Sequence, residues 1–244
     1  MALTCTRSLA VIEPECDIQR RMTLANIMRH AQQMGSYHLA ELGLGYKRLY
    51  EDGMVFLVSK MKVTVNRRPE FDEQLQLVTI PKQPKGAQFI RDTIFKSAAG
   101  EKLIEVSIAW LLVEPEEHRI LRPSVFQVYG LEMTPNDGES ITGYRIRKPA
   151  QDGTLHMRQV KYSDLDYNGH VNNAIYANMI YDALPTEVTL QHELEEFGIL
   201  YQKEAKLGQV IELEVIQMDE KGLAYYVGGK VEDGRCFEAE IKFQ

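Results

Sequence analysis

The stretch that decides the fold covers residues 164–185 and reads DLDYNGHVNNAIYANMIYDALP. Its first part places an acid, an amide and an imidazole at alternate positions, namely Asp166, Asn168 and His170. Its second part, residues 171–184, has a helix-like composition and is followed by Pro185, which cannot continue a helix. The pattern predicts a polar cluster at the start of a helix, where unpaired backbone N–H groups are available.

Strand candidates surround this helix in the second half of the chain. One precedes it at residues 155–162, and four follow it at residues 198–205, 210–218, 223–231 and 236–243. The turns at residues 219–222 and 232–234 are short, whereas a parallel crossover needs about a dozen residues or more. The second half therefore predicts one helix packed on an antiparallel meander.

The first half repeats this order. Residues 22–42 carry apolar or small side chains at steps of three and four, which predicts an amphipathic helix with Thr23 as its cap. Two-residue alternation predicts strands at residues 60–65 and 104–112. Weaker patterns predict two more strands, at residues 75–80 and 89–96, separated by a turn-rich segment at residues 81–86. We predict an α+β fold in two copies, each a long helix on a curved antiparallel sheet. The alternative is an accidental pair of α+β segments.

Turn-forming residues dominate residues 134–153, which predicts a surface linker between the two copies. The expected organisation is an N-terminal module at residues 1–132, a linker at residues 133–153 and a C-terminal module at residues 154–244. A chain of 244 residues with 44% hydrophobic and 26% charged residues is long enough for two small cored domains.

Composition also limits the cellular context and the cofactors. No apolar run approaches the roughly 18 residues of a membrane span, and the first residues are too polar for a secretory signal, so we expect a soluble cytoplasmic protein. The three cysteines are odd in number and widely spaced, which argues against disulfides and a paired-cysteine zinc site. Asp164 and Asp166 lack further ligands at a readable spacing, so we expect no metal and no cofactor.

The charge is distributed unevenly along the chain. The formal net charge of -7 argues against general nucleic-acid binding. Residues 1–130 hold 17 Lys+Arg against 15 Asp+Glu, while residues 131–244 hold 11 against 20. An acidic partner is therefore expected on the first half. Its basic groups are candidates for steering such a partner, and they are Lys60, Lys62, Arg67, Arg68, Lys82, Lys85 and Arg91. For Lys60 and Lys62 the alternative is that they form the solvent face of a strand.

The order Asp166-x-Asn168-x-His170-Val171-Asn172-Asn173 resembles the signature of the acyl-acyl carrier protein thioesterases. In that family the signature opens the central helix of a hotdog domain and acts with a Glu in a Tyr-x-x-Glu context. Here Tyr201-Gln202-Lys203-Glu204 supplies this Glu, 34 residues after His170. The resemblance implies a tandem hotdog fold, hydrolysis of fatty acyl-acyl carrier protein thioesters to free fatty acid, and four catalytic residues, Asp166, Asn168, His170 and Glu204.

The chemistry requires a base for the attacking water and donors for the developing oxyanion. Our hypothesis has Glu204 and His170 deprotonate water, Asn168 orient the carbonyl or the water, and Asp166 fix the arrangement through hydrogen bonds. Backbone N–H groups at the start of the following helix would polarise the carbonyl oxygen. In the alternative scheme, Asp166 attacks directly and forms an acyl anhydride. Some relatives, notably plant ones, carry Cys after the Glu; Ala205 stands there, which excludes a thiol nucleophile at this position.

Each candidate also has an ordinary structural interpretation. Asp166 and Asn168 are common turn residues, His170 fits a packed core histidine, and Glu204 fits a solvated surface carboxylate. Asn172 or Asn173 fits a helix cap, although we also take Asn173 as a substrate-binding candidate.

If the second module carries the chemistry, the first can receive the acyl chain. Met28, Met34 and Leu39 are then candidates for its apolar lining, with ordinary core packing as the alternative. The thioester carrier is coenzyme A or the phosphopantetheine arm of acyl carrier protein, and the resemblance favours the latter.

Two rival functions remain on the same fold, a hydroxyacyl-thioester dehydratase and a non-catalytic acyl-binding protein.

Hotdog sheets often join side by side, so both a monomer and a homodimer are compatible with a fused pair.

Overall fold

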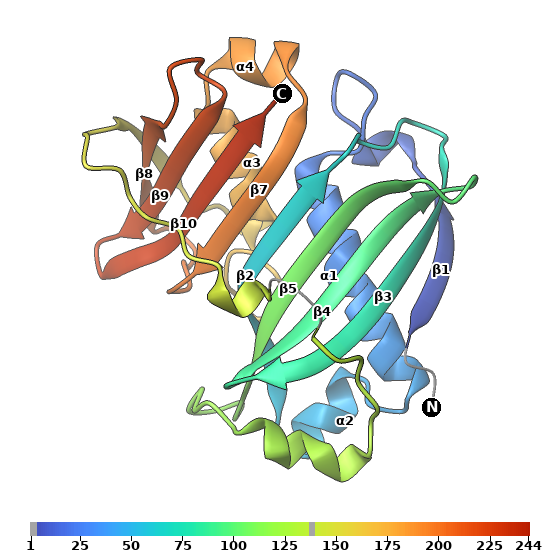
Figure 1. Ribbon diagram of the computed structural model, residues 1–244. Coiled ribbons are helices and arrows are strands. Elements are labelled where there is room, and N and C mark those ends of the chain that lie inside the picture. Colours follow the sequence, from blue (N-terminus) through green and yellow to red (C-terminus); the bar gives the residue numbers. More distant parts are fainter. Residues whose placement is uncertain (1–3, 137–139) are drawn as a thin grey trace.

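The computed structural model describes residues 4–136 and 140–244, and in these residues ten strands form one antiparallel sheet (Figure 1). The strand order is β1-β3-β4-β5-β2-β7-β10-β9-β8-β6. The strands are β1 (Cys5–Ala10), β2 (Val55–Val65), β3 (Gln74–Lys85), β4 (Gln88–Ser97), β5 (Lys102–Val113), β6 (Thr154–Gln159), β7 (Leu194–Tyr201), β8 (Val210–Gln217), β9 (Ala224–Val231) and β10 (Gly234–Phe243). The two halves of the chain meet where β2 pairs with β7, from Lys60 opposite Leu200 to Thr64 opposite Glu196.

The longest helix of each half, α1 and α3, lies behind the sheet in Figure 1, and these two helices are in contact. The helices are α1 (Leu24–Glu41), α2 (Tyr46–Glu51), α3 (Ile175–Ala183) and α4 (Thr186–Gln191), with 3₁₀ turns η1 (Glu13–Glu15), η2 (Pro123–Tyr129), η3 (Ile141–Gly143) and η4 (Tyr162–Asp164). One hydrophobic core includes side chains of both halves, from Leu24 and Met28 of α1 to Ile180 of α3. The predicted α+β arrangement of a helix on a curved antiparallel sheet, present twice, is therefore confirmed.

The first predicted helix is confirmed, but the second is shorter than expected. The hydroxyl of Thr23 accepts a hydrogen bond from the Asn26 N–H and caps α1, as predicted. The second helix begins at Ile175 and not at Val171. The reason is local, because the side chain and backbone carbonyl of Asn172 accept the N–H groups of Ala174 and Ile175 and hold a turn before the helix.

The predicted turn at residues 81–86 is wrong, because β3 continues through Lys85. The neighbouring strand β1 pairs with β3 only from Gln74 to Thr79, so the later part of β3 is an edge. The Pro81 carbonyl points away from β4 and accepts the Thr134 N–H. Proline is tolerated at such an edge because its missing N–H breaks no ladder hydrogen bond.

The segment predicted as a linker crosses the face of the sheet opposite the helices (Figure 1). Three of its residues, 137–139, lie outside the described residues. The described part is packed more closely than its composition suggested, since Ile141 and Ile146 are buried. The Lys60 ammonium donates to the carbonyls of Thr142 and Tyr144 at 3.2 and 3.3 Å, which fixes the segment over β2.

Gly198 of β7 makes room for the side chain of Tyr144. A Cβ atom at Gly198 would lie 1.9 Å from the Tyr144 hydroxyl, so Gly198→Ala must displace the ring. We expect this change to destabilise the protein by about 1–3 kcal/mol, as overpacked sites do, measured by urea unfolding. Gly143→Ala is the control, because nothing lies within 4 Å of its Cβ position. Equal stability of the two variants would contradict the packing described here.

Among the helices of the described residues, none is long and apolar enough to cross a membrane. Cys5, Cys16 and Cys236 are all free thiols.

Candidate active site

The predicted polar cluster forms a closed loop between η4 and the turn that leads into α3. The Asp166 N–H donates to the His170 carbonyl at 2.9 Å, and the Gly169 N–H donates back to the Asp166 carbonyl at 3.0 Å. Gly169 has a φ of 80°, a left-handed conformation that glycine adopts without strain. The Asp166 carboxylate accepts the Asn168 N–H at 2.9 Å, so it already holds the loop in shape.

The loop lies beside the segment that follows β7. The Val171 N–H donates to the Ala205 carbonyl at 3.0 Å, and His170 forms a β-bridge with Lys206. This pairing brings the His170 Nε2 atom to 3.0 Å from a Glu204 carboxylate oxygen. The side chains are 24% and 42% exposed, so solvent reaches a pair that can accept and return a proton.

All four predicted catalytic residues line one cavity of about 1250 Å³, together with Asn173. Asn168 is exposed at its edge, next to Tyr167, whose ring contacts Tyr46 of α2 edge-on with centroids 5.6 Å apart. Within the described residues, no group of three His, Cys, Asp or Glu side chains is placed to hold a metal ion.

The first half supplies the rest of the cavity wall, and much of that wall is apolar. Its apolar side chains include Leu39, Leu49, Met54, Phe56, Phe89, Trp110, Phe126 and Met133. Of the three lining candidates, Leu39 is in the wall, but Met28 and Met34 are not. Both methionines lie in the core, 0% and 2% exposed, because they point from α1 toward the sheet. Their prediction as chain-lining residues is therefore wrong, and ordinary core packing explains them.

Sequence reasoning assigned no role to three polar residues of the cavity wall, Gln32, Tyr176 and Tyr201. The Asn173 amide donates to the Gln32 side chain of α1 at 3.3 Å, and the Tyr201 hydroxyl donates to the Asn173 carbonyl at 3.0 Å. Burial raises the pKa of Tyr201 well above its ordinary value, and burial likewise raises the pKa of Tyr176. Both phenols therefore stay protonated at neutral pH. Tyr201 belongs to the Tyr-x-x-Glu context, whereas the Gln32 contact spans 141 residues and leaves no local signal.

The first half contains a structural copy of the polar loop, 149 residues earlier in the chain. There Asp17, Gln19 and Arg21 stand at the positions of Asp166, Asn168 and His170. The hydrogen bonds correspond: the Asp17 N–H donates to the Arg21 carbonyl at 2.9 Å, and the Asp17 carboxylate accepts the Gln19 N–H at 2.9 Å. Arg20 takes the place of Gly169 and shares its positive φ, at 61°.

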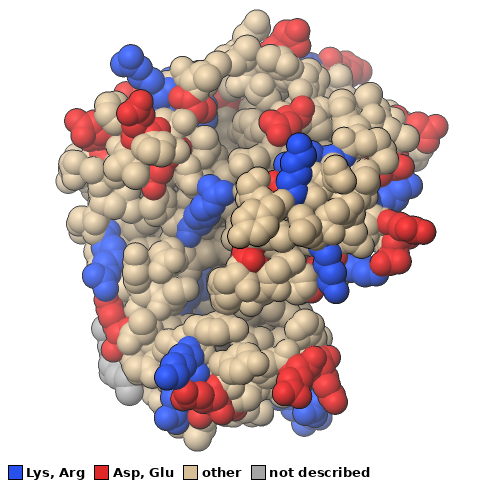
Figure 2. Space-filling model, turned by 180° about the vertical axis from the view of Figure 1, so that it is seen from behind, with Lys and Arg blue, Asp and Glu red and all other residues tan. Residues whose placement is uncertain are grey.

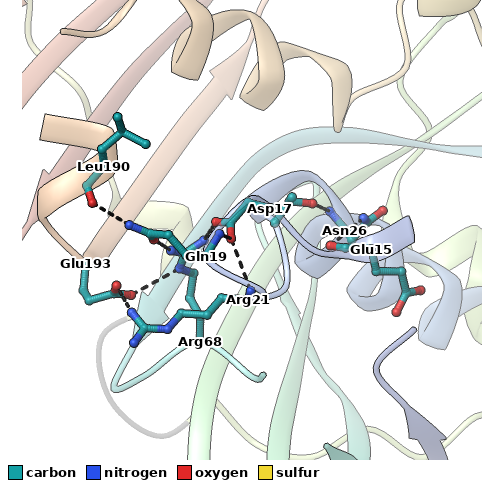
Figure 3. A network of polar contacts seen from close by, with 9 residues as sticks. Glu15, Asp17, Gln19, Arg21, Asn26, Arg68, Leu190 and Glu193 are labelled. Atoms are coloured by element: carbon teal, nitrogen blue, oxygen red, sulfur yellow. Dashed lines mark hydrogen bonds and ion pairs between the residues drawn. The ribbon is translucent and has the colours of Figure 1, made fainter. Parts of the chain in front are cut away.

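The copy in the first half has no counterpart of the His170–Glu204 pair. The Met22 N–H donates to the Pro69 carbonyl as Val171 does to Ala205, which places Arg68 where Glu204 stands in the second half. Arg68 is 4% exposed and binds Asp17, the Gln19 side chain at 2.9 Å and Glu193 at 3.3 Å (Figure 3). Arg21 also pairs with Glu193, which comes from the second half. The same backbone therefore carries a His-Glu pair in one half and an ion-pair network joining the halves in the other.

The basic groups named as steering candidates do not form a patch. Lys60 and Arg68 are buried, and Lys62 pairs with Glu196 at 2.9 Å. Arg67 pairs with Glu73 at 2.7 Å, Lys82 pairs with Asp92 at 3.0 Å, and Arg91 lines the cavity. Acidic and basic side chains are interspersed over the face seen from the helix side (Figure 2). Local pairing therefore neutralises Lys62, Arg67, Arg68 and Lys82, and steering of an acidic partner by the basic groups of the first half stays a prediction.

The fold and the site define a tandem hotdog protein with an Asp, Asn, His and Glu cluster in its second unit. Two family descriptions match the chain, the acyl-ACP thioesterase N-terminal domain over residues 3–124 and the C-terminal domain over residues 147–244. The chain belongs to the acyl-ACP thioesterase family, as the resemblance predicted.

Individual relatives are distant in sequence. A chloroplastic palmitoyl-acyl carrier protein thioesterase of Cuphea hookeriana is 24% identical over 91% of this chain and 57% of its own length. The chain thus spans little more than half the length of the curated relatives it matches. A 12:0-ACP thioesterase from Umbellularia californica has a TM-score of 0.88 at 17% identity, covering 100% of this chain and 98% of that one. An acyl-ACP thioesterase from Bacteroides thetaiotaomicron has a TM-score of 0.85 at 20% identity, covering 99% and 98%. These structures confirm the tandem hotdog fold.

Proposed function

We propose that this protein hydrolyses fatty acyl-acyl carrier protein thioesters to free fatty acid and the carrier thiol. The observation that carries the proposal is the His170–Glu204 pair, 3.0 Å apart, in the wall of a cavity that continues into an apolar region of the first half. Family membership supports the same reaction. In this division of labour the first module, residues 1–132, receives the acyl chain. The module at residues 154–244 carries the catalytic residues, and the linker at residues 133–153 joins the two.

In the proposed mechanism, the His170–Glu204 pair takes a proton from water as the water oxygen attacks the thioester carbonyl. The tetrahedral intermediate then collapses, the carbon–sulfur bond breaks, and the proton held by the pair passes to the leaving sulfur. Asn168, exposed at the cavity edge, orients the carbonyl or the water. The buried phenols of Tyr176 and Tyr201 stay protonated and keep a second negative charge out of this region.

The developing oxyanion needs a donor other than the one first expected. The N–H groups of Val171, Asn172, Ala174 and Ile175 are already bonded to Ala205, Asp164 and Asn172. Among the described residues the Asn173 N–H has no acceptor, and Asn173 lines the cavity. We assign the oxyanion contact to this N–H. The sequence pattern predicts these donors at the start of the helix. The Asn173 N–H instead lies before the helix, because the helix begins at Ile175 and not at Val171.

Asp166 acts in this proposal by holding the loop, since its carboxylate accepts the Asn168 N–H. In single-turnover hydrolysis in ¹⁸O-labelled water, we expect the label in the released fatty acid and none in Asp166, as measured by peptide mass spectrometry. The label in Asp166 would instead support the acyl-anhydride scheme.

The test of the function is a panel of saturated and 3-hydroxylated acyl chains of varied length, each on acyl carrier protein and on coenzyme A. Free fatty acid, enoyl product and free thiol are measured in the same reactions. We expect equimolar fatty acid and thiol, with faster turnover on acyl carrier protein. An enoyl product would identify a dehydratase, while binding without turnover would identify an acyl-binding protein.

A further inference from the structure

An arginine lies inside the cavity, in a wall that the proposed function assigns to a hydrocarbon chain. Arg91 projects from β4, lines the cavity, and donates to the His38 ring nitrogen at 3.1 Å and to the Thr79 hydroxyl at 3.2 Å. Helix α1 approaches it at Gly35, where a Cβ atom would lie 3.2 Å from the Arg91 side chain. The close approach of backbone to guanidinium leaves this group enclosed on the helix side.

Arg91 contacts the His38 ring and the Thr79 hydroxyl, and neither partner is a carboxylate. Within residues 4–136 and 140–244, no carboxylate lies within ion-pair distance of its guanidinium. Burial lowers the pKa of Arg91 to about 10, so the group is still a cation at neutral pH. A partly buried cation without a carboxylate partner is costly, and such groups mark functional sites more often than ordinary cores.

A donor without an acceptor lies in the same wall. Trp110 of β5 lines the cavity, and its indole N–H is inaccessible and has no acceptor in the described part of the chain. In the β4–β5 ladder Trp110 lies opposite Phe89, and Ile108 lies opposite Arg91. Arg91 and Trp110 are thus diagonal neighbours, a spacing that long side chains can bridge. A cation without a carboxylate partner and an indole N–H without an acceptor therefore lie close together in the cavity wall.

These donors come from β4 and β5 of the first half, whereas the proposed catalytic residues belong to the second half. The side chain of Gln32 contacts Asn173 of the catalytic half, and Gly35 lies about one helical turn further along α1. We propose that the cavity receives acyl chains that carry an oxygen acceptor, a hydroxyl or a carboxylate, on the part of the chain remote from the thioester. The oxygen would accept hydrogen bonds from Arg91 and Trp110. This inference rests on the proposed function for its thioester, but the binding of the chain can be measured by itself.

The physical reason is the cost of covering a cation with hydrocarbon. A methyl-terminated chain that fills the cavity removes the remaining water from Arg91 and returns no hydrogen bond. An oxygen on the chain replaces that water. Because a charged donor makes a stronger hydrogen bond than a neutral one, the preference is expected to be roughly tenfold to a hundredfold.

The test compares free acids of equal carbon number with a methyl, hydroxymethyl or carboxyl end. Their affinity is measured by displacement of a fluorescent fatty acid from the full chain, which needs no turnover. We expect the two oxygen-bearing acids to bind roughly tenfold or more tightly than the plain acid, and Arg91→Leu to reverse this order. Lys96→Leu is the control, because it removes the same charge from β4 on the opposite face. The relative affinity of the hydroxymethyl and carboxyl acids shows which oxygen the site prefers.

Equal affinity for all three acids in the wild-type protein would overturn the inference. So would an oxygen preference that survives in Arg91→Leu. If Arg91→Leu does not fold, Gly35→Ala provides the second variant, since its Cβ would lie 3.2 Å from the Arg91 Cδ atom and shift the side chain, which is expected to weaken the preference. Failure of the proposed function is distinguishable, because it would abolish hydrolysis of plain acyl thioesters and leave these binding ratios intact.

Discussion

Replacing His170 with Ala is expected to lower kcat for acyl-acyl carrier protein hydrolysis by about 10²–10⁴-fold, the range for loss of a general acid-base group. The imidazole is the partner of Glu204 at 3.0 Å, and the described cavity wall offers no other histidine in contact with that carboxylate. The measurement is release of free fatty acid under saturating substrate. Glu204→Gln keeps the shape of the partner and removes its charge, so its kcat should fall in the same direction.

The double variant, His170→Ala with Glu204→Gln, tests whether the two residues act together or independently. If His170 and Glu204 act as a pair, the combined loss should be close to that of the worse single change, since residues that act as a unit are not additive. His156→Ala is the matched control, because this histidine lies on β6, away from the cavity, and should retain full activity. A His170→Ala enzyme with normal kcat would remove the imidazole from the mechanism.

Sequence reasoning recovered what depends on local pattern. Alternation and helical spacing identified α1 and most strands, and the polar signature identified the residues that the structure gathers around His170. Errors arose where tertiary contacts override local preference. Pro81 lies within β3 because β1 does not extend beside that part of the strand, and Met28 lies in the core because of how α1 faces the sheet.

The internal copy of the loop was present in the sequence but not recognised. Asp17, Gln19 and Arg21 preserve the spacing of Asp166, Asn168 and His170, yet only the Asp is identical, because Gln is a longer amide than Asn and Arg replaces His. The common feature is the backbone, since Asp at the first position caps the same loop in both halves. A repeat of backbone structure with changed side chains is invisible to motif comparison, which weighs residue identity. The contact of Gln32 with Asn173 was equally inaccessible, because only the packing of α1 beside α3 creates it.

Arg68→Ala is expected to destabilise the protein by about 3–5 kcal/mol, the cost of removing one partner from a buried ion pair. Its guanidinium is 4% exposed and bonds to Asp17 and Glu193 (Figure 3). Removal leaves the Asp17 carboxylate without its cation, while Glu193 keeps Arg21. For a chain of this size the loss corresponds to a fall in Tm of about 6–20 °C, measured by calorimetry.

The neighbouring residue provides the control. Arg67 pairs with Glu73 at the surface, where its side chain is 41% exposed, so Arg67→Ala should cost about 1 kcal/mol or less. Because the Arg68 network joins the loop of the first half to the start of β7, its loss should also reduce the cooperativity of unfolding between the halves. The His170–Glu204 pair is not part of this network, so kcat well below the Tm should be unchanged. Equal Tm values for the Arg67 and Arg68 variants would mean that the first-half loop does not hold the two modules together.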